Sequence, residues 1–184
     1  MQLIPQAIPE VKLLVPVVHR DHRGFFTERW RHDLPDLPAA WAQDNHARSS
    51  KGTLRGLHYQ TAQHAQGKLV GVARGSILDI AVDLRRGSPT FGRHVAAQLD
   101  DELQNQLWVP AGFAHGYLVL SDVADVVYKV DYPYTPRANR GVRWDDATLS
   151  IDWALGALGL ATPTLSETDA NLPDLANADI DFVY

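Results

Sequence analysis

Histidine, tyrosine and lysine side chains that can move or stabilise protons stand in three short apolar runs of this sequence. His58 lies in the run Leu54–Gln60, Lys68 begins the next run, and Tyr128 lies in a third. A neutral histidine can remove a proton from carbon near neutral pH, and a tyrosine with a pKa of about 10 can donate one. A lysine ammonium can stabilise a developing enolate oxygen. The three residues therefore supply a base, an acid and a cation for acid–base chemistry.

Further polar residues that suit a ligand gather in short segments near these three. They include Gln43-Asp44-Asn45-His46, Gln66-Gly67-Lys68 and Pro110-Ala111-Gly112-Phe113-Ala114-His115-Gly116. Strands that are distant in the sequence can bring such segments together inside a β-barrel. We therefore expect one polar cavity rather than several separate sites.

The histidines do not have the spacing of a metal site. Many metal-binding cupins use a His-x-His pair, a nearby glutamate and a later histidine, but His58 is followed by Tyr59 and Gln60. No glutamate lies between Tyr59 and Glu102, and His58, His64 and His115 lack ligand spacing. The chain has no cysteine, which excludes thiolate metal sites, disulfides and thiol nucleophiles. We expect no metal.

Length and composition are typical of one globular domain, which we expect to span residues 1–184. The formal net charge is −5 and no block of Lys and Arg stands out, which argues against a nucleic-acid-binding protein. The N-terminal residues lack the pattern of a signal peptide, and no run of 18 apolar residues indicates a membrane span. A cytoplasmic location is the expectation.

Short runs rich in Val, Ile, Leu and aromatic residues, bounded by Gly and Pro, predict many strands and an all-β sandwich or barrel. The predicted strands are Thr53–Gln60, Lys68–Ala73, Ser76–Leu84, Val95–Leu99, Gln106–Val109, Ala114–Leu120 and Asp125–Tyr132. Short helices are expected at Arg31–Asp36, Asp146–Ser150 and Ser166–Ala176. The first thirty residues contain three prolines and predict an extended arm, of the kind that packs on a neighbouring subunit.

Two of these strands raise questions that the pattern leaves open. In Ser76–Leu84 one face is apolar and the other carries Asp79 and Asp83. The face with the two carboxylates either meets solvent or lines a polar cavity, and solvent exposure is the commoner arrangement. In Thr53–Gln60, strict alternation places Arg55 and His58 on opposite faces, and a bulge at Gly56 would bring them to one face.

Several motifs, in order along about nine-tenths of the chain, resemble those of dTDP-4-dehydrorhamnose 3,5-epimerases. They are Asp21–Phe26, Asp44-Asn45, Arg55–Gln60, Gln66–Val70, Asp79–Arg85, Gly87–Gly92, Trp108–Pro110, Gly112–Gly116, Tyr128-Lys129, Leu165-Ser166 and Asp169-Ala170. The resemblance implies a cupin-like jelly-roll β-barrel, a homodimer and no cofactor. It implies a nucleotide-sugar substrate, dTDP-4-dehydro-6-deoxy-D-glucose, and acid–base epimerisation at C3 and C5.

The resemblance also implies a role for each candidate residue. His58 is the expected base, Asp169 the carboxylate that orients it, Tyr128 the acid on the opposite sugar face, and Lys68 the cation at the enolate oxygen. The sugar and diphosphate would be held by Arg55, Gln43, Asn45, His115 and Tyr134, and the nucleotide by Arg23 and Glu28 from the partner's arm.

Alternatives remain for the roles and for the reaction. By itself, Ser166 followed by Asp169 approximates a capping box, in which Asp169 serves the helix, and Tyr134 is a second candidate for the acid. A 3-epimerase or a 3,4-ketoisomerase could use a similar pocket. A non-catalytic sugar-nucleotide-binding cupin is the alternative outside enzymes, and it would not need His58.

Overall fold

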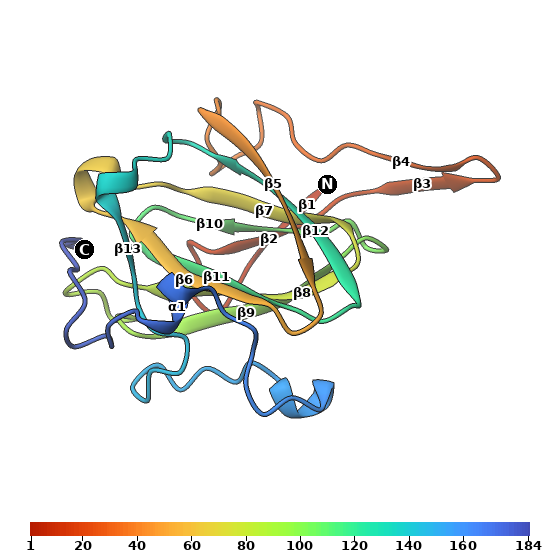
Figure 1. Cartoon of the computed structure of the whole chain (residues 1–184). Helices are drawn as coiled ribbons and strands as arrows, with labels where there is room; N and C mark the ends of the chain where they lie inside the picture. The colour runs from red at the N-terminus through yellow and green to blue at the C-terminus, as the bar shows by residue number, and fades with distance from the viewer.

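Two antiparallel β-sheets face each other in the computed structural model, which describes residues 1–184 (Figure 1). One sheet has the strand order β1-β2-β10-β7-β12-β5, and the other has the order β13-β6-β11-β8-β9. The strands are β1 (Gln2–Pro5), β2 (Lys12–Val15), β3 (Val18–Asp21), β4 (Gly24–Thr27), β5 (Gln43–Ser50), β6 (Leu54–Gln60), β7 (Lys68–Arg74), β8 (Ser76–Asp83), β9 (His94–Asp100), β10 (Gln106–Val109), β11 (Phe113–Val119), β12 (Val123–Val130) and β13 (Asn139–Gly141). The chain passes between the sheets at almost every turn from β5 onward, which confirms the all-β barrel.

All seven strands predicted from the sequence are present, with ends that differ by at most two residues. The N-terminal arm is extended as expected: β1 and β2 add to the edge of the six-stranded sheet, and β3 and β4 form a separate hairpin. Strand β5 was not predicted, although it pairs with β12 along its whole length, from Gln43 to Ser50.

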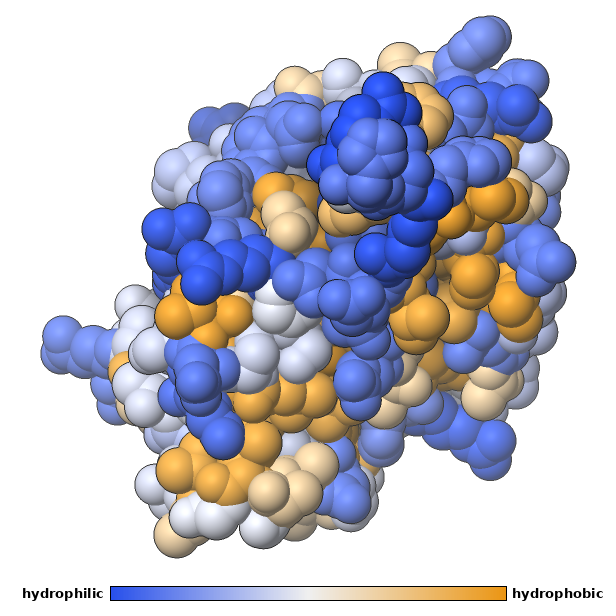
Figure 2. Space-filling model, turned by 90° about the vertical axis from the view of Figure 1, so that its right-hand side faces the viewer, coloured by the Kyte–Doolittle hydropathy of each residue, from blue (hydrophilic) through white to orange (hydrophobic).

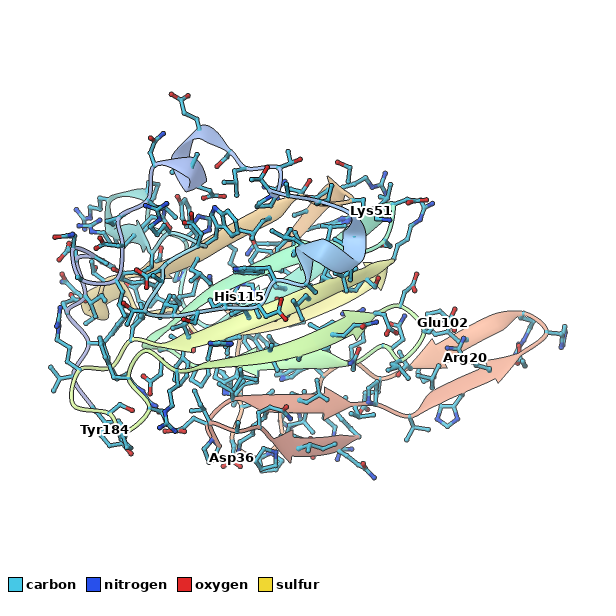
Figure 3. The ribbon with its side chains drawn as sticks, turned by 90° about the horizontal axis from the view of Figure 1, so that it is seen from below. Arg20, Asp36, Lys51, Glu102, His115 and Tyr184 are labelled. Carbon is cyan, nitrogen blue, oxygen red and sulfur yellow. The ribbon has the colours of Figure 1, made fainter.

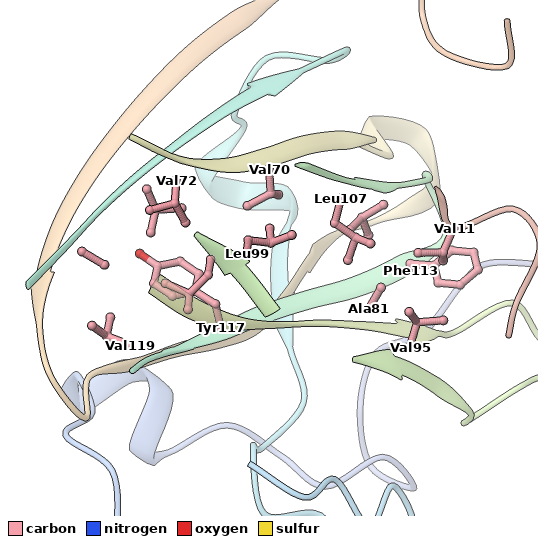
Figure 4. Close-up of a cluster of buried hydrophobic side chains, with 14 of the residues drawn as sticks. Val11, Val70, Val72, Ala81, Val95, Leu99, Leu107, Phe113, Tyr117 and Val119 are labelled. Atoms are coloured by element: carbon pink, nitrogen blue, oxygen red, sulfur yellow. The ribbon is translucent and has the colours of Figure 1, made fainter. Parts of the chain in front are cut away.

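Residues of both sheets that point inward form the core of the barrel (Figure 4). Val70 and Val72 of β7 face Ala81 of β8 and Tyr117 of β11 across this space. Side chains alternate between the two faces of a strand, so these residues identify the inward positions of each strand. By this rule Lys68 points inward with Val70 and Val72.

A second apolar layer covers the outer face of the five-stranded sheet. Leu57, Ile80 and Leu118 pack there against Trp153 and Phe182 of the C-terminal region. A smaller cluster on the six-stranded sheet contains Leu14, Leu34, Leu69 and Trp108. Both faces of the central strands are therefore buried.

The two carboxylates of β8 point into the barrel and are buried there, so the expectation of a solvent-exposed face is wrong, although neither carboxylate lines a cavity directly. Asp79 and Asp83 are fully buried. Asp83 is neutralised by Arg85, whose guanidinium donates two hydrogen bonds to it, at 2.9 and 2.7 Å. This ion pair is largely buried, since the Arg85 and Asp83 side chains are 15% and 0% exposed. The C-terminal region that covers this sheet accounts for the burial of the other face.

Helix is scarcer than predicted. The only α-helix is α1 (Glu167–Ala170), with 3-10 turns η1 (Ala62–His64), η2 (Pro136–Ala138) and η3 (Leu155–Leu158). The helices expected at Arg31–Asp36 and Asp146–Ser150 are absent. The Asp146 carboxylate instead accepts hydrogen bonds from the backbone N–H groups of Thr148 and Leu149, an arrangement that competes with a helix. Helix α1 ends well before the predicted Ala176, since the residue before Pro173 is disfavoured in helical conformation.

The hairpin β3–β4 projects from the barrel at its upper right in Figure 1. Its Phe25 and Phe26 are 50% and 71% exposed. The face from which the hairpin projects shows apolar groups between hydrophilic ones (Figure 2). No helix in the structure has the length and apolarity needed to cross a membrane.

Candidate active site

A β-bulge in β6 places Arg55 and His58 on the same wall of a cavity. In the pairing with β11, His115 lies opposite His58 and Tyr117 lies opposite Arg55, so two residues of β6 face the single residue Gly116. The extra residue turns Leu57 outward into the second apolar layer and His58 inward. The bulge expected at Gly56 is thereby confirmed.

His58 is held by a carboxylate from the far end of the chain. Its Nε2 lies 2.6 Å from Oδ1 of Asp169, which is in helix α1. The Asp169 side chain is 5% exposed and that of His58 is 32% exposed, so the carboxylate is shielded while the ring reaches the cavity. The other imidazole nitrogen, Nδ1, has no protein partner and is available to a ligand.

Asp169 serves the helix as well, through a different atom. Its backbone N–H donates to Oγ of Ser166 at 3.0 Å, which is the N-cap hydrogen bond of α1. Burial alone would raise the pKa of Asp169, but the hydrogen bond and charge of His58, with the backbone N–H of Gly56, lower it overall. Only the Ser166 half of the capping box is present, because the Asp169 carboxylate bonds His58 and Gly56 instead of the backbone N–H of Ser166. An ionised carboxylate therefore lies beside the imidazole.

Lys68 and Tyr128 face His58 from the opposite sheet. Both lie on inward positions, Lys68 on β7 and Tyr128 on β12, whereas His58 belongs to β6 of the five-stranded sheet. A molecule in the space between the sheets would therefore meet His58 on one side and Tyr128 on the other.

The cavity has two lobes of about 260 Å³ each, which share His58, Lys68, Tyr128 and Asn139. One lobe is completed by Ala47, Arg55, His115, Tyr117, Ser166, Thr168 and Asp169. The other is completed by Gln43, Asn45, Tyr59, Gln60, Gln66 and Tyr134. The structure thus brings together nine of the eleven residues predicted for the site.

Burial shifts the proton affinities of the two residues on the six-stranded sheet. It lowers the pKa of Lys68 to about 8, although the negative charge of Asp79 opposes this shift. Burial raises the pKa of Tyr128, an effect that the positive charge of Arg55 partly offsets. At pH 7 the lysine is therefore mostly an ammonium ion, and the tyrosine keeps its proton.

The rim of the cavity offers hydrogen-bonding groups for an anionic ligand. The Arg55 guanidinium donates from Nε to Ser49 at 3.0 Å and forms no ion pair, so its remaining N–H groups are free for an anion. Gln43 bonds Asn45 at 2.7 Å and accepts the backbone N–H of Tyr134 at 2.9 Å. Tyr134 lies beyond the end of β12, on a loop, and is 52% exposed.

Arg23 and Glu28 lie outside the cavity of their own chain. Arg23 is near the tip of the β3–β4 hairpin, where it pairs with Asp21. Glu28 follows the hairpin and lies 3.9 Å from Arg31. One chain alone therefore does not bring these two residues to His58.

Two residues that line the cavity have no clear signal in the sequence. Asn139 begins β13 after the Pro136 turn, and Thr168 precedes Asp169. Neither interrupts an apolar pattern, so neither was predicted. No three or more His, Cys, Asp or Glu residues are grouped in a way that could hold a metal ion.

Comparisons with known proteins agree with this geometry. A sequence model of the family described as dTDP-4-dehydrorhamnose 3,5-epimerase matches residues 5–177. The dTDP-4-dehydrorhamnose 3,5-epimerase of Pseudomonas aeruginosa is 48% identical over 177 residues, which are 94% of this chain and 95% of that protein.

Solved structures show the same fold. The crystal structure of dTDP-6-deoxy-D-glucose-3,5-epimerase from Legionella pneumophila, in complex with dTDP-4-keto-L-rhamnose, is 43% identical with a TM-score of 0.89, and the match covers 96% of this chain and 93% of that one. ChmJ, a 3′-monoepimerase from Streptomyces bikiniensis in complex with dTDP-quinovose, is 36% identical with a TM-score of 0.86, covering 94% and 87%. This chain belongs to the dTDP-4-dehydrorhamnose 3,5-epimerase family.

Proposed function

We propose that this chain is an isomerase that inverts C3 and C5 of dTDP-4-dehydro-6-deoxy-D-glucose, giving dTDP-4-dehydro-L-rhamnose for dTDP-L-rhamnose biosynthesis. The observation that carries the proposal is the placement of a histidine–carboxylate pair and a tyrosine on opposite walls of one cavity. Inversion at carbon needs proton removal on one face and delivery on the other. The proposal agrees with the family and with the cytoplasmic location expected from the sequence.

His58 acts as the base. Its Nδ1 removes the proton from the carbon next to the 4-keto group, and Asp169 stabilises the imidazolium that forms. The electron pair of the broken C–H bond moves to the keto oxygen and gives an enolate. The Lys68 ammonium lies on the opposite wall and offsets the charge on that oxygen. Tyr128 then delivers its proton to the other face of the carbon.

The 4-keto group acidifies both C3 and C5, so one base and one acid serve both positions if the ring turns between the two steps. Between the steps His58 releases its proton to solvent and Tyr128 takes a proton from solvent, which restores the base and the acid. Arg55 and His115, with Gln43 and Asn45, hold the sugar and the diphosphate. Tyr128 is preferred to Tyr134 as the acid because Tyr128 lines both lobes of the cavity from an inward position, whereas Tyr134 lines one lobe from a loop and is largely exposed. Tyr128→Phe should therefore reduce turnover far more than Tyr134→Phe.

The active form is a homodimer in which the hairpin of one chain completes the cavity of the other. This assembly would take Arg23 and Glu28 to the nucleotide and cover the exposed Phe25 and Phe26. A groove of about 550 Å³ on the outer face of the six-stranded sheet, lined in part by Thr27 at the end of the hairpin, offers a contact surface. No metal or organic cofactor takes part in the proposed steps.

A mixing experiment tests the shared site. Arg23→Ala and His58→Ala chains should each be poorly active alone, and mixed dimers should recover activity, because one of their two cavities has an intact arm and an intact base. Light scattering would check the dimer, and a monomeric active protein would contradict this part of the proposal.

Solvent exchange tests the reaction itself. With dTDP-4-dehydro-6-deoxy-D-glucose in D₂O, deuterium should enter at C3 and C5, as followed by NMR. His58→Ala should slow the exchange by about 10²- to 10⁴-fold, while His64→Ala, outside the cavity, should not. Label at C3 alone would indicate a 3-epimerase, as in ChmJ, and exchange that survives His58→Ala would exclude His58 as the base. No exchange in the wild-type protein would favour a binding module or another sugar nucleotide.

A further inference from the structure

Asp79 is a fully buried carboxylate to which the proposed reaction gives no role. Its Oδ1 lies 2.7 Å from Nε2 of His115, in the middle of the barrel (Figure 3). Its Oδ2 is buried and has no hydrogen-bond partner. A buried carboxylate oxygen without a partner costs free energy, and Asp83, on the same face of the same strand, is fully engaged by Arg85, Ser88 and Thr90. The free oxygen of Asp79 therefore points to a function.

The contact with Asp79 requires a proton on Nε2 of His115. Because a carboxylate accepts, the ring must donate its Nε2–H, and Nδ1 is left without a protein partner. The His115 side chain is 8% exposed and lines the lobe that contains His58 and Lys68. Asp79 thus determines which nitrogen of His115 can meet a ligand.

Asp79 also acts on Lys68, which reaches the same interior from the other sheet. Lys68 forms no hydrogen bond or ion pair through its side chain, and the charge of Asp79 opposes the fall in the pKa of Lys68 that burial causes. Other ionisable groups that line the cavity around Lys68 are Arg55, His58 and Tyr59 from β6, His115 and Tyr117 from β11, Tyr128 from β12, Tyr134 from the following loop and Asp169 from α1. Asp131 follows β12, and its carboxylate accepts the backbone N–H of Gly67 at 2.7 Å.

Of the carboxylates near Lys68, Asp79 is the one with a buried oxygen that has no hydrogen-bond partner. Asp169 is occupied by His58. Asp131 follows Val130, which is buried and alternates with the inward Val126 and Tyr128, so Asp131 is on the outer face of its strand. The charge of Asp79 is therefore the main local support for an ammonium ion at Lys68.

We infer that Asp79 is a positioning residue for the epimerisation: its carboxylate fixes His115 with Nδ1 toward the substrate and keeps Lys68 charged where the enolate oxygen develops. The inference rests on the proposed function, but its electrostatic part holds in the free protein and can be measured there.

Asp79→Asn is the direct test, because asparagine keeps the shape and one accepting oxygen but loses the charge. The chain has four lysines, so ¹³C NMR can follow Lys68, identified by its absence from Lys68→Met. The titration midpoint of Lys68, about pH 8 in the wild-type protein, should fall by about one pH unit or more in Asp79→Asn. The alkaline limb of the kcat/KM profile, which reports the groups of the free enzyme, should move by the same amount.

Asp83→Asn is the matched control, since it removes an equally buried carboxylate from the same face of β8. It should lower stability but leave the Lys68 titration and the shape of the pH profile unchanged. An unchanged Lys68 midpoint in Asp79→Asn would overturn the inference. A moved midpoint with an unmoved kcat/KM profile would also overturn the role in the reaction.

A measurement on the wild-type protein keeps the inference testable if Asp79→Asn does not fold. ¹⁵N NMR of His115, assigned with His115→Asn, should show a neutral ring protonated on Nε2 or a doubly protonated ring. A ring protonated on Nδ1 alone would contradict the inference. If the wild-type protein shows no solvent exchange on the sugar, the proposed function fails, while the Lys68 and His115 measurements still decide the electrostatic part separately.

Discussion

Replacing Lys68 with methionine should make the protein more stable and a much poorer enzyme. Methionine is unbranched and of similar length, so it can occupy the space of the lysine stem. Burial lowers the pKa of Lys68 from 10.5 to about 8, and Asp79 only partly opposes this. At pH 7 the side chain is charged in both states, so the folded protein carries a charge that the unfolded chain solvates better.

The fall in the pKa sets the size of the effect. One pKa unit corresponds to about 1.4 kcal/mol, so the change from 10.5 to about 8 corresponds to roughly 3 kcal/mol. This is an upper limit for Lys68→Met, because Lys68 keeps some contact with water, and we expect a gain of about 1 to 3 kcal/mol. The charge of Asp79 is already included, because it acts on Lys68 in the wild-type protein.

The pH dependence has a definite sign. Below about pH 8 the buried amine is charged in the folded state, and the full cost is present. Between about pH 8 and 10.5 the unfolded chain binds more protons than the folded one, so wild-type stability rises relative to Lys68→Met. The advantage of Lys68→Met should therefore be largest at pH 7 and disappear above pH 10.5.

Urea unfolding at pH 7 and at pH 10 would compare the stabilities of the wild-type and Lys68→Met proteins. One fixed protein concentration is needed, because the proposed dimer links stability to concentration. Lys51→Met is the control: Lys51 is exposed and has no ion pair, so its replacement should change stability by less than about 0.5 kcal/mol. A Lys68→Met protein less stable than the wild type at pH 7, or a difference that does not vary with pH, would refute the reasoning.

Two further substitutions test the geometry of the β6 strand. Asp169→Asn should reduce kcat by about 10²- to 10⁴-fold with little change in KM, since His58 loses the charge that stabilises its imidazolium; steady-state kinetics would check this, and a selective rise in KM would indicate a binding role instead. Gly56→Ala should destabilise the protein by about 3 kcal/mol or more, because Gly56 has φ +123° and an added Cβ would lie 2.6 Å from Cα of Gly116. Gly87→Ala, with φ +87° and nothing within 4 Å of its Cβ, has the same kind of backbone strain without the clash, and equal losses in urea unfolding of the two variants would argue against tight packing at the bulge.

The strands that carry the site residues could be predicted wherever apolar residues dominate them. Strand β8 is an example, since Ile77, Ile80 and Val82 indicate it directly. The bulge at Gly56 could also be predicted, because Arg55 and His58 can share one wall only if β6 contains an extra residue. The alternation of apolar residues was sufficient to predict these strands. The conflict between the faces of Arg55 and His58 was sufficient to predict the bulge.

Strand β5 could not be predicted because its inward face is part of the site. Its inward residues are Gln43, Asn45, Ala47 and Ser49, which line the cavity or bond a residue that does. The apolar alternation by which a strand is identified is therefore missing. The strand forms because β12 offers it a complete edge for pairing, a long-range cause that no short window of sequence contains.

Predicting that Asp79 is buried would have required knowing what covers both faces of β8. An alternating strand with carboxylates on one face is typical of a sheet with one side in water, and here the C-terminal region covers the apolar side, so the carboxylates point inward. The polar residues at inward positions of the central strands then share one feature: each interrupts a row of apolar core residues. Lys68 continues the inward row of Val70 and Val72, and Asp79 separates Ile77 from Ala81 in another.

Such residues make no contribution to an apolar core, and the lowered pKa of Lys68 shows that one of them opposes folding. A barrel with apolar residues at these positions would fold at least as well. In the proposed reaction, these polar residues supply a base, an acid and two supporting charges directed at one space between the sheets. On a strand with both faces buried, a polar residue that interrupts the apolar alternation is therefore the strongest local indication of the active site in this fold.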